Sequence, residues 1–241
     1  MDDYQAVFRR RELKYLLTER QLDALLPILK AHLVPDAYPH SSIFNLYYDT
    51  PDFRMIRRSL EKPQYKEKLR LRSYGPAGDR TQVFPEIKKK AQGIVYKRRV
   101  SLPYAEALIY LSRCCPGGSG QIFRELDWML SSYASLAPQV FLSYERDSWQ
   151  GTSASPLRLT LDREILWRTD SPDLRLGAWG KPLLRPGQVL MEIKILNAVP
   201  LWLAKVLSEN GIFPVSFSKY GRAYETICKR TLKEMEMKKY A

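Results

Sequence analysis

Seven segments of the chain place charged residues at every second position, which is the spacing that puts side chains on one face of a β-strand. In residues 66–72 these positions are Lys66, Lys68, Arg70 and Arg72. The pattern recurs at Arg10/Glu12/Lys14, Glu86/Lys88/Lys90, Lys97/Arg99, Tyr144/Arg146, Arg158/Thr160/Asp162 and Glu192/Lys194. Arginine and lysine are the residues that bind phosphate oxygens. Strands whose basic faces converge therefore predict a site for a polyanion.

Carboxylates stand among these basic positions at Glu12, Glu86, Asp162 and Glu192. Carboxylate oxygens are the ligands that hard divalent cations prefer, so one or two of these acids are candidates to hold a metal. An ion pair with a neighbouring arginine or lysine explains any single acid equally well. Glu192 is the preferred ligand because Glu192-Ile193-Lys194 lies in a strongly patterned strand, with Glu12 and Glu86 as further candidates.

The residues between the charged positions are mainly apolar, for example Leu69, Leu71, Ile87, Leu159 and Ile193. If the charged faces were ordinary solvent-exposed surfaces, the apolar faces would still have to be buried. Helices packed on the outside would bury them and leave the charge inside.

The elements that must position these residues follow from periodicity and turn chemistry. Strands are expected near 5–17, 41–48, 64–74, 81–91, 94–102, 139–150, 156–166 and 188–196. Helices are expected from the capping box Thr18-x-x-Gln21, which opens the first of them, to about 33, and at 53–60, 103–113, 122–133, 200–210 and beyond 218. Pro35 and Pro39 are expected to break the chain before the second strand. The pattern predicts one α+β domain over residues 1–241, in which about eight mostly antiparallel strands form a closed or nearly closed barrel tunnel with helices outside.

The composition limits the classes of function. The chain has 241 residues, 45% hydrophobic content and a net charge of +13, which favours an anionic partner. No apolar run reaches the length of a membrane span, and the start lacks the order of a signal peptide. Cys114, Cys115 and Cys228 form neither a disulfide framework nor a zinc knuckle, so we expect a reduced, cytoplasmic protein.

The ordered set of motifs resembles the VTC domain, the polyphosphate polymerase catalytic domain within the triphosphate tunnel metalloenzymes. The residues that carry the resemblance are Arg10-x-Glu12-x-Lys14-Tyr15, Tyr47-Tyr48-Asp49-Thr50, Lys68–Gly75, Glu86–Lys90, Lys97-Arg98-Arg99, Tyr144-Glu145-Arg146, Arg158–Asp162, Glu192-Ile193-Lys194 and Ser218-Lys219-Tyr220. Each motif alone is weak evidence for the family, whereas their occurrence in the same order over nearly the whole chain is specific to it.

The resemblance implies a β-barrel tunnel that holds the phosphates of a nucleoside triphosphate, with Glu192 as the Mn²⁺ or Mg²⁺ ligand. The expected catalytic residues are Arg70, Arg72, Lys88, Arg146, Arg158 and Lys219. The expected substrate-binding residues are Arg10, Lys14, Lys68, Lys90, Lys97, Arg99, Tyr144 and Lys194.

Two positions depart from the family pattern. Hydrolytic tunnel enzymes typically open with Glu-x-Glu-x-Lys, whereas this chain has Arg10 at the first glutamate, which favours transfer over hydrolysis. Ser216 stands where the characterised polymerase has a further lysine, which weakens the case for product-chain binding.

The expected function is transfer of the γ-phosphate of ATP to inorganic polyphosphate, with ATP and polyphosphate or pyrophosphate as partners and a separate membrane partner as a further candidate. The alternatives are a hydrolase of tripolyphosphate or nucleoside triphosphates and a non-catalytic polyphosphate-binding module. Nucleic-acid binding ranks last, because the tyrosines are scattered instead of alternating with the basic residues.

Overall fold

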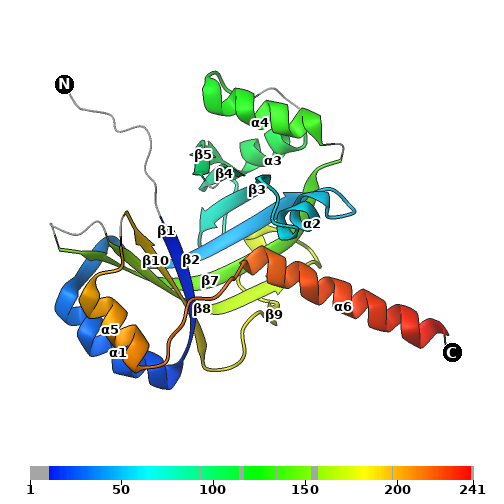
Figure 1. Cartoon of the computed structure of the whole chain (residues 1–241). Coiled ribbons are helices and arrows are strands. Elements are labelled where there is room, and N and C mark those ends of the chain that lie inside the picture. Colours follow the sequence, from blue (N-terminus) through cyan, green and yellow to red (C-terminus); the bar gives the residue numbers. More distant parts are fainter. Residues whose placement is uncertain are drawn as a thin grey trace. The chain divides into compact units, whose positions relative to one another are not determined.

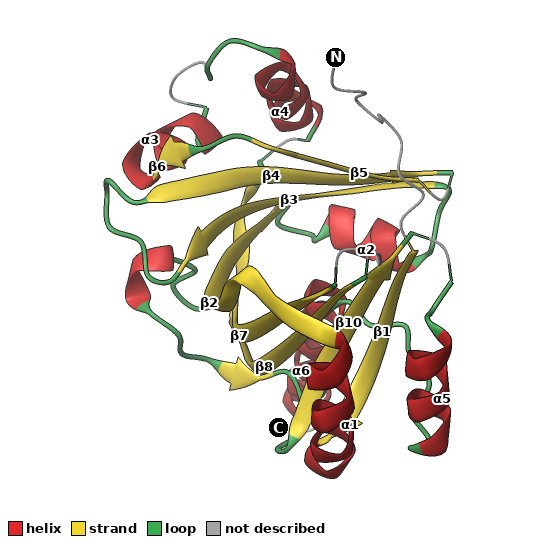
Figure 2. Cartoon of the chain, turned by 90° about the vertical axis from the view of Figure 1, so that its left-hand side faces the viewer, coloured by secondary structure: helices red, strands yellow, loops and turns green. Residues whose placement is uncertain are grey.

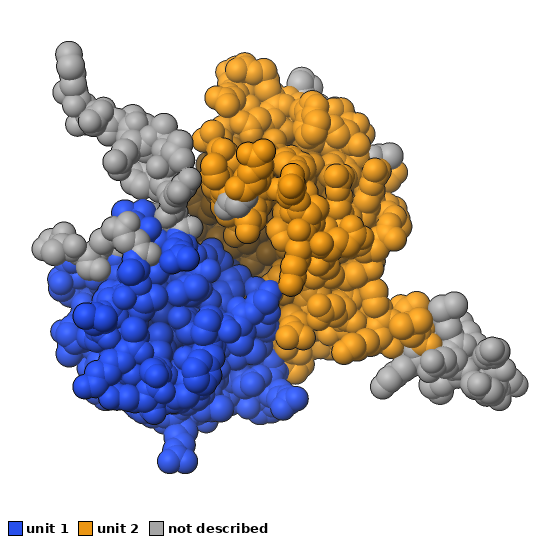
Figure 3. All heavy atoms as spheres, viewed as in Figure 1, with its two compact units in different colours: residues 1–41, 144–165, 184–217 blue, residues 42–143, 166–183, 218–241 orange. Residues whose placement is uncertain are grey.

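The structure is a computed structural model that describes residues 11–92, 94–113, 117–133, 135–152, 157–196 and 198–239 (Figure 1). The chain divides into two compact units (Figure 3). Unit 1 comprises residues 1–41, 144–165 and 184–217, and unit 2 comprises residues 42–143, 166–183 and 218–241.

The fold combines helices with an antiparallel sheet, which confirms the α+β prediction (Figure 2). The strands are β1 (Arg11–Thr18), β2 (Leu33–Asp49), β3 (Tyr65–Tyr74), β4 (Gln82–Ala91), β5 (Ile94–Arg99), β6 (Leu102–Pro103), β7 (Ala137–Gly151), β8 (Arg158–Arg168), β9 (Lys181–Pro182) and β10 (Gln188–Ile195). Their hydrogen-bonded order is β1-β10-β8-β7-β2-β3-β4-β5, with β6 on β4 and β9 on β8. Within the described part of the chain, β1 and β5 end this order, so closure into a barrel stays a prediction.

In unit 1, α1 (Glu19–His32) and α5 (Leu201–Glu209) cover the apolar face of the strands. Leu25 of α1 and Leu203 of α5 belong to the same buried core as Leu17, Leu161 and Ile193 from β1, β8 and β10. The predicted capping box at the start of α1 is confirmed, since the Thr18 side chain accepts the backbone N–H of Gln21 and the Gln21 side chain accepts the backbone N–H of Thr18.

In unit 2, α3 (Tyr104–Leu111) and α4 (Gln121–Ser132) lie over the apolar face of β3 and β4 (Figure 2). Leu69, Leu71 and Ile87 form a core with Leu111 and Met129 of these helices. The unit also contains α2 (Arg54–Leu60), α6 (Lys219–Lys239) and a short 3-10 turn at Leu174–Leu176. In each unit, therefore, helices bury the apolar strand face as predicted.

The prediction that Pro35 and Pro39 break the chain is wrong, because both lie within β2. β3 pairs with β2 only over Ile43–Tyr48, so the proline-containing half of β2 has no β3 partner along that side. A strand edge tolerates proline, which cannot donate a ladder hydrogen bond.

Several boundaries also differ from expectation. Residues 5–10 of the first predicted strand, and Cys114 and Cys115, lie outside the described residues. The strand predicted at 94–102 is divided into β5 and β6, and β9 lies outside all of the predicted strands. Cys228 is a half-buried free thiol. None of the described helices combines the length and the apolar content needed to cross a bilayer.

Candidate functional site

The register of β3, β4 and β5 places charged residues of unit 2 on one strand face. Lys68 lies opposite Lys88, which lies opposite Lys97 on β5. Arg70 lies opposite Glu86, which in turn lies opposite Arg99. We call this surface the basic face; it contains four cations from β3, two from β4, two from β5 and one carboxylate, namely Lys66, Lys68, Arg70, Arg72, Lys88, Lys90, Lys97, Arg99 and Glu86.

The row Lys68, Lys88 and Lys97 is the strongest indication of a ligand in this face. Like charges directly opposite each other on neighbouring strands are destabilising. Lys88 and Lys97 are exposed to solvent, so an anion can reach them. At Lys66, burial and then the neighbouring Lys90 lower the pKa of the ammonium group, which shows the same crowding of positive charge. A bound polyanion would remove this repulsion.

Glu86 is the carboxylate of the basic face, and its surroundings are those of a structural ion pair. Its side chain is 1% exposed and contacts Nη2 of Arg70 at 2.6 Å and Nζ of Lys97 at 2.8 Å. Arg72 and Arg99 follow at 4.0 Å. Burial alone would raise the pKa of Glu86, but the nearby cations, chiefly Arg70 and Arg72, outweigh it and lower the pKa to about 2. The carboxylate therefore holds the arginines in place.

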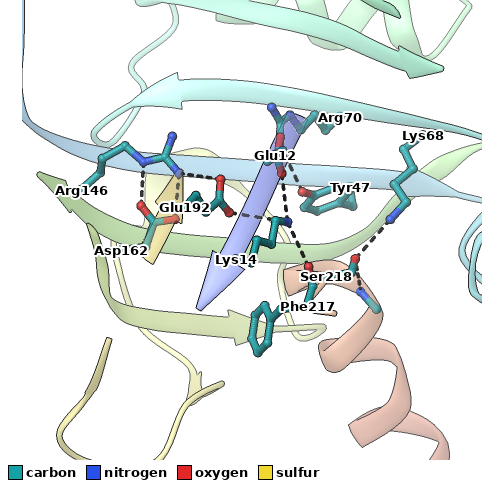
Figure 4. Close-up of polar contacts among 11 residues, drawn as sticks. Glu12, Lys14, Tyr47, Lys68, Arg70, Arg146, Asp162, Glu192, Phe217 and Ser218 are labelled. Atoms are coloured by element: carbon teal, nitrogen blue, oxygen red, sulfur yellow. Dashed lines mark hydrogen bonds and ion pairs between the residues drawn. The ribbon is translucent and has the colours of Figure 1, made fainter. Parts of the chain in front are cut away.

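The first turn of α6 is attached to the same face. Nζ of Lys68 donates to Oγ of Ser218 at 3.2 Å, and the same oxygen accepts the backbone N–H of Gly221 at 3.1 Å (Figure 4). This capping arrangement places the predicted catalytic Lys219, which is buried, at the beginning of the helix.

Unit 1 carries a different charged surface, which we call the carboxylate face and define as Glu12, Lys14, Arg146, Asp162 and Glu192. Nζ of Lys14 lies 3.2 Å from Oε1 of Glu12 and 3.6 Å from Oε1 of Glu192 (Figure 4). The same ammonium group donates to the carbonyl oxygen of Phe217 at 2.9 Å. One lysine thus lies between two carboxylates.

Arg146 of β7 connects Asp162, the third carboxylate of this face, with Glu192. Its Nε and Nη2 atoms donate to the two oxygens of Asp162 at 2.6 and 2.7 Å, and Nη2 lies 3.9 Å from Oε2 of Glu192 (Figure 4). Burial alone would lower the pKa of Arg146, but Tyr144, Asp162 and Glu192 outweigh it and raise the pKa. The guanidinium group stays charged and is oriented by Asp162.

The donors present fit a divalent cation that takes most of its ligands from water and phosphate. Among the described residues, no three His, Cys, Asp or Glu side chains form a cluster that could enclose a metal. Mg²⁺ and similar ions are usually held by one or two carboxylates together with substrate phosphates. Glu192 and Glu12 match that pattern, since their nearest cations lie at 3.2 to 3.9 Å. Glu86 does not, because Arg70 and Lys97 already contact its oxygens at 2.6 and 2.8 Å.

The remaining predicted residues are placed as follows. The guanidinium group of Arg146 lies over the ring of Tyr144, with 5.1 Å between Cζ of Arg146 and the ring centroid. Arg158 is ion-paired with Asp36 at the exposed end of β8, and Lys194 lies opposite it on β10. Arg10 lies outside the described residues. The predicted residues thus form two groups, one in each unit.

Tyr47, Asp49 and Tyr220 were not among the predicted site residues. The ring of Tyr47 stacks on that of Tyr220 with 4.4 Å between centroids, and the Tyr220 hydroxyl donates to Oδ2 of buried Asp49 at 2.9 Å. The signal was present in β2, where Asn45, Tyr47 and Asp49 alternate with apolar residues. The sequence pattern does not show that β2 pairs with β3, so it did not place this alternation beside the basic strands.

Comparison with known proteins identifies the family. The family described as the VTC domain matches residues 9–228. A candidate adenylate cyclase from Bacillus halodurans has a similar fold, with a TM-score of 0.53 and 16% identity over 88% of this chain and 94% of that one. A candidate adenylate cyclase from Vibrio parahaemolyticus aligns with a TM-score of 0.48 and 13% identity over 91% and 99% of the two chains. None of the curated proteins compared with the sequence matches it.

Proposed function

Because the chain belongs to the VTC domain family, which supports a triphosphate-binding or phosphotransfer function, we propose that it is an ATP-dependent polyphosphate polymerase. In this proposal it transfers the γ-phosphate of ATP to the end of an inorganic polyphosphate chain. The observation that carries the proposal is the basic face of unit 2, in which Lys68, Lys88 and Lys97 lie in one row across three strands.

The reaction requires residues that position the two phosphates and neutralise their charge, more than it requires a side chain that forms a covalent bond. Phosphoryl transfer depends mainly on holding the reactants in line and stabilising charge. Two phosphates about 4 Å apart repel each other by about 4 kcal/mol per charge pair at intermediate dielectric. Arg70 and Arg72 are suited to hold phosphate oxygens, and the lysine row is suited to neutralise the donor and acceptor. The attacking terminal phosphate is already anionic, so no general base is needed.

Metal binding belongs to unit 1 in this proposal. Glu192, assisted by Glu12, would hold Mn²⁺ or Mg²⁺, and the ion would neutralise phosphate oxygens when bound. Lys14 and Arg146 hold the two carboxylates in place through the contacts described above.

The proposal includes the tunnel that the sequence pattern predicts. An opening at each end of the tunnel would let the product move on without release. It also includes a cytoplasmic location, which supplies ATP, and leaves a membrane partner as a candidate recipient of the product.

The deciding experiment is incubation of the purified protein with ATP and Mn²⁺. Chains long enough to stain on a gel support the polymerase. Release of ADP and free phosphate alone would mean a hydrolase, and binding of polyphosphate without turnover would mean a binding module. Lys88→Ala should abolish turnover while the variant stays folded, because its side chain is exposed in the basic face. Lys205→Ala, on the exposed surface of α5, is the matched control and should keep full activity.

A further inference from the structure

Tyr47 of β2 lies beside Arg70 of the basic face (Figure 4). It lies opposite Arg70 in the register of β2 and β3, and only 8% of the residue is exposed. The stack on Tyr220 has an interplanar angle of 17°, and Tyr220 is itself anchored to Asp49. The phenol of Tyr47 therefore presents its hydroxyl group from a fixed position.

The hydroxyl of Tyr47 has an unused capacity to donate. Its oxygen accepts a hydrogen bond from Nη1 of Arg70 at 3.3 Å. A phenol can also donate its own proton, yet no acceptor for it exists among the residues that the structure describes. The charged groups that act on the phenol come from β3 and are Arg70, Lys68 and Arg72, none of which can accept a hydrogen bond. Within the described part of the chain the phenol proton therefore has no acceptor, and a bound ligand can supply one.

We propose that the Tyr47 hydroxyl donates a hydrogen bond to a phosphate oxygen of the bound substrate, and that it does so only in its neutral form. This inference rests on the proposed phosphate-binding role of the basic face. Arg70 would hold the phenol oxygen on one side while the phenol proton is directed to the anion. Tyr47 would thus add a neutral, pH-sensitive donor to a set of permanent cations.

The charge around Tyr47 makes this dependence measurable. Burial alone would raise the pKa of Tyr47, but Arg70, Lys68 and Arg72 outweigh it and lower the pKa to about 8. Tyr220, which packs against it from α6, stays neutral because burial and Asp49 raise its pKa. As a phenolate, Tyr47 would have no proton to donate and would repel phosphate. Affinity for phosphate should therefore fall as the pH rises through about 8, and bound phosphate should raise the pKa of Tyr47.

The test is calorimetric titration of the full chain with tripolyphosphate at about pH 7 and about pH 9, on either side of the expected titration. At the lower pH, Tyr47→Phe should bind about tenfold more weakly than the wild type, which is the loss expected for one hydrogen bond to a charged group. At the higher pH, the two proteins should bind alike. Tyr133→Phe is the matched control, because its hydroxyl donates to Glu67 on the opposite face of the sheet, at 2.8 Å. It should match the wild type at both pH values.

Ultraviolet titration of tyrosine provides a second readout. The wild type and Tyr133→Phe should show one tyrosine that ionises near pH 8, and added tripolyphosphate should move that ionisation upward. Failure of the wild type to bind tripolyphosphate would overturn the proposed function itself. Binding by the wild type, with equal affinity and pH dependence in Tyr47→Phe, would overturn only the role of Tyr47. If Tyr47→Phe does not fold, the wild type alone provides the test. A tyrosine ionisation near pH 8 that added tripolyphosphate does not shift would then overturn the role of Tyr47.

Discussion

Each unit of the molecule buries one glutamate of a Glu-Ile-Lys tripeptide in a charged strand face, but the two glutamates have different neighbours. Glu86 of unit 2 contacts Arg70 at 2.6 Å and Lys97 at 2.8 Å. Glu192 of unit 1 lies 3.6 Å from Lys14 and 3.9 Å from Arg146. The first carboxylate is closely neutralised, whereas the second shares its cations with Glu12 and Asp162.

This difference shows that residue type and strand position do not decide the role of a buried acid. In unit 2, Glu86 lies within ion-pair distance of arginines and a lysine and orders them. In unit 1, Lys14 and Arg146 each contact two carboxylates. This contrast supports the proposal that phosphate binds mainly in unit 2 and the metal ion in unit 1.

The largest effect should come from removing the structural glutamate. Glu86→Ala would remove the buried carboxylate that half-buried Arg70 and exposed Lys97 contact, and breaking a buried ion pair costs up to about 3–5 kcal/mol of unfolding free energy. Urea denaturation measures this loss. A change below about 1 kcal/mol would show that Glu86 is not a structural residue and would remove the contrast between the units.

Acid should weaken unit 2 through the same residue. Because Glu86 has a pKa of about 2 in the folded protein against an ordinary value of 4.5, its contribution is complete above about pH 4.5 and is lost as the pH falls through about 2. The shift corresponds to about 3 kcal/mol of unfolding free energy. Urea denaturation across this range should show the loss, and Glu86→Gln should flatten the profile. An unchanged slope in Glu86→Gln would assign the acid sensitivity to other carboxylates.

Removing the glutamate of unit 1 should act on metal binding instead of stability. Glu192→Ala should lower Mn²⁺-dependent turnover at least about 100-fold, since even indirect ligand partners are worth about 10–100-fold. Mn²⁺ titration of the variant, with and without tripolyphosphate, should show weakened metal affinity. A loss of stability as large as that of Glu86→Ala, with Mn²⁺ affinity retained, would make Glu192 a second structural ion pair.

The smallest effect should come from Arg158 at the exposed end of β8. Its partner is Asp36, and exposed ion pairs contribute about 0–1 kcal/mol. Arg158→Ala should therefore leave the thermal unfolding midpoint nearly unchanged. Its effect on tripolyphosphate affinity, compared with that of Arg70→Ala, tests whether the arginine-rich face of unit 2 dominates phosphate binding. A larger loss of affinity in Arg158→Ala would reverse that assignment.

The sequence predicted the strand faces and the local capping chemistry well, because both depend on near neighbours in the chain. The alternation of Lys66–Arg72 and the box at Thr18 and Gln21 are examples, and both are found in the structure. Partnerships between distant segments could not be predicted, such as the four cations around Glu86 or the stack of Tyr47 on Tyr220. The two Glu-Ile-Lys tripeptides have the same sequence, and they differ only in the residues that the fold places next to them. Pro35 and Pro39 were misread because the unpaired edge of β2 depends on where β3 begins to pair.

The most direct test of the account is calorimetric titration of tripolyphosphate into the wild type, Lys88→Ala and Lys205→Ala. Lys88 lies between Lys68 and Lys97 in the row of the basic face, whereas Lys205 is an exposed residue of α5 paired with Glu209. The account predicts that Lys88→Ala weakens binding about tenfold or more and that Lys205→Ala binds like the wild type. Equal affinity of all three proteins would contradict the claim that the lysine row of unit 2 is the phosphate site.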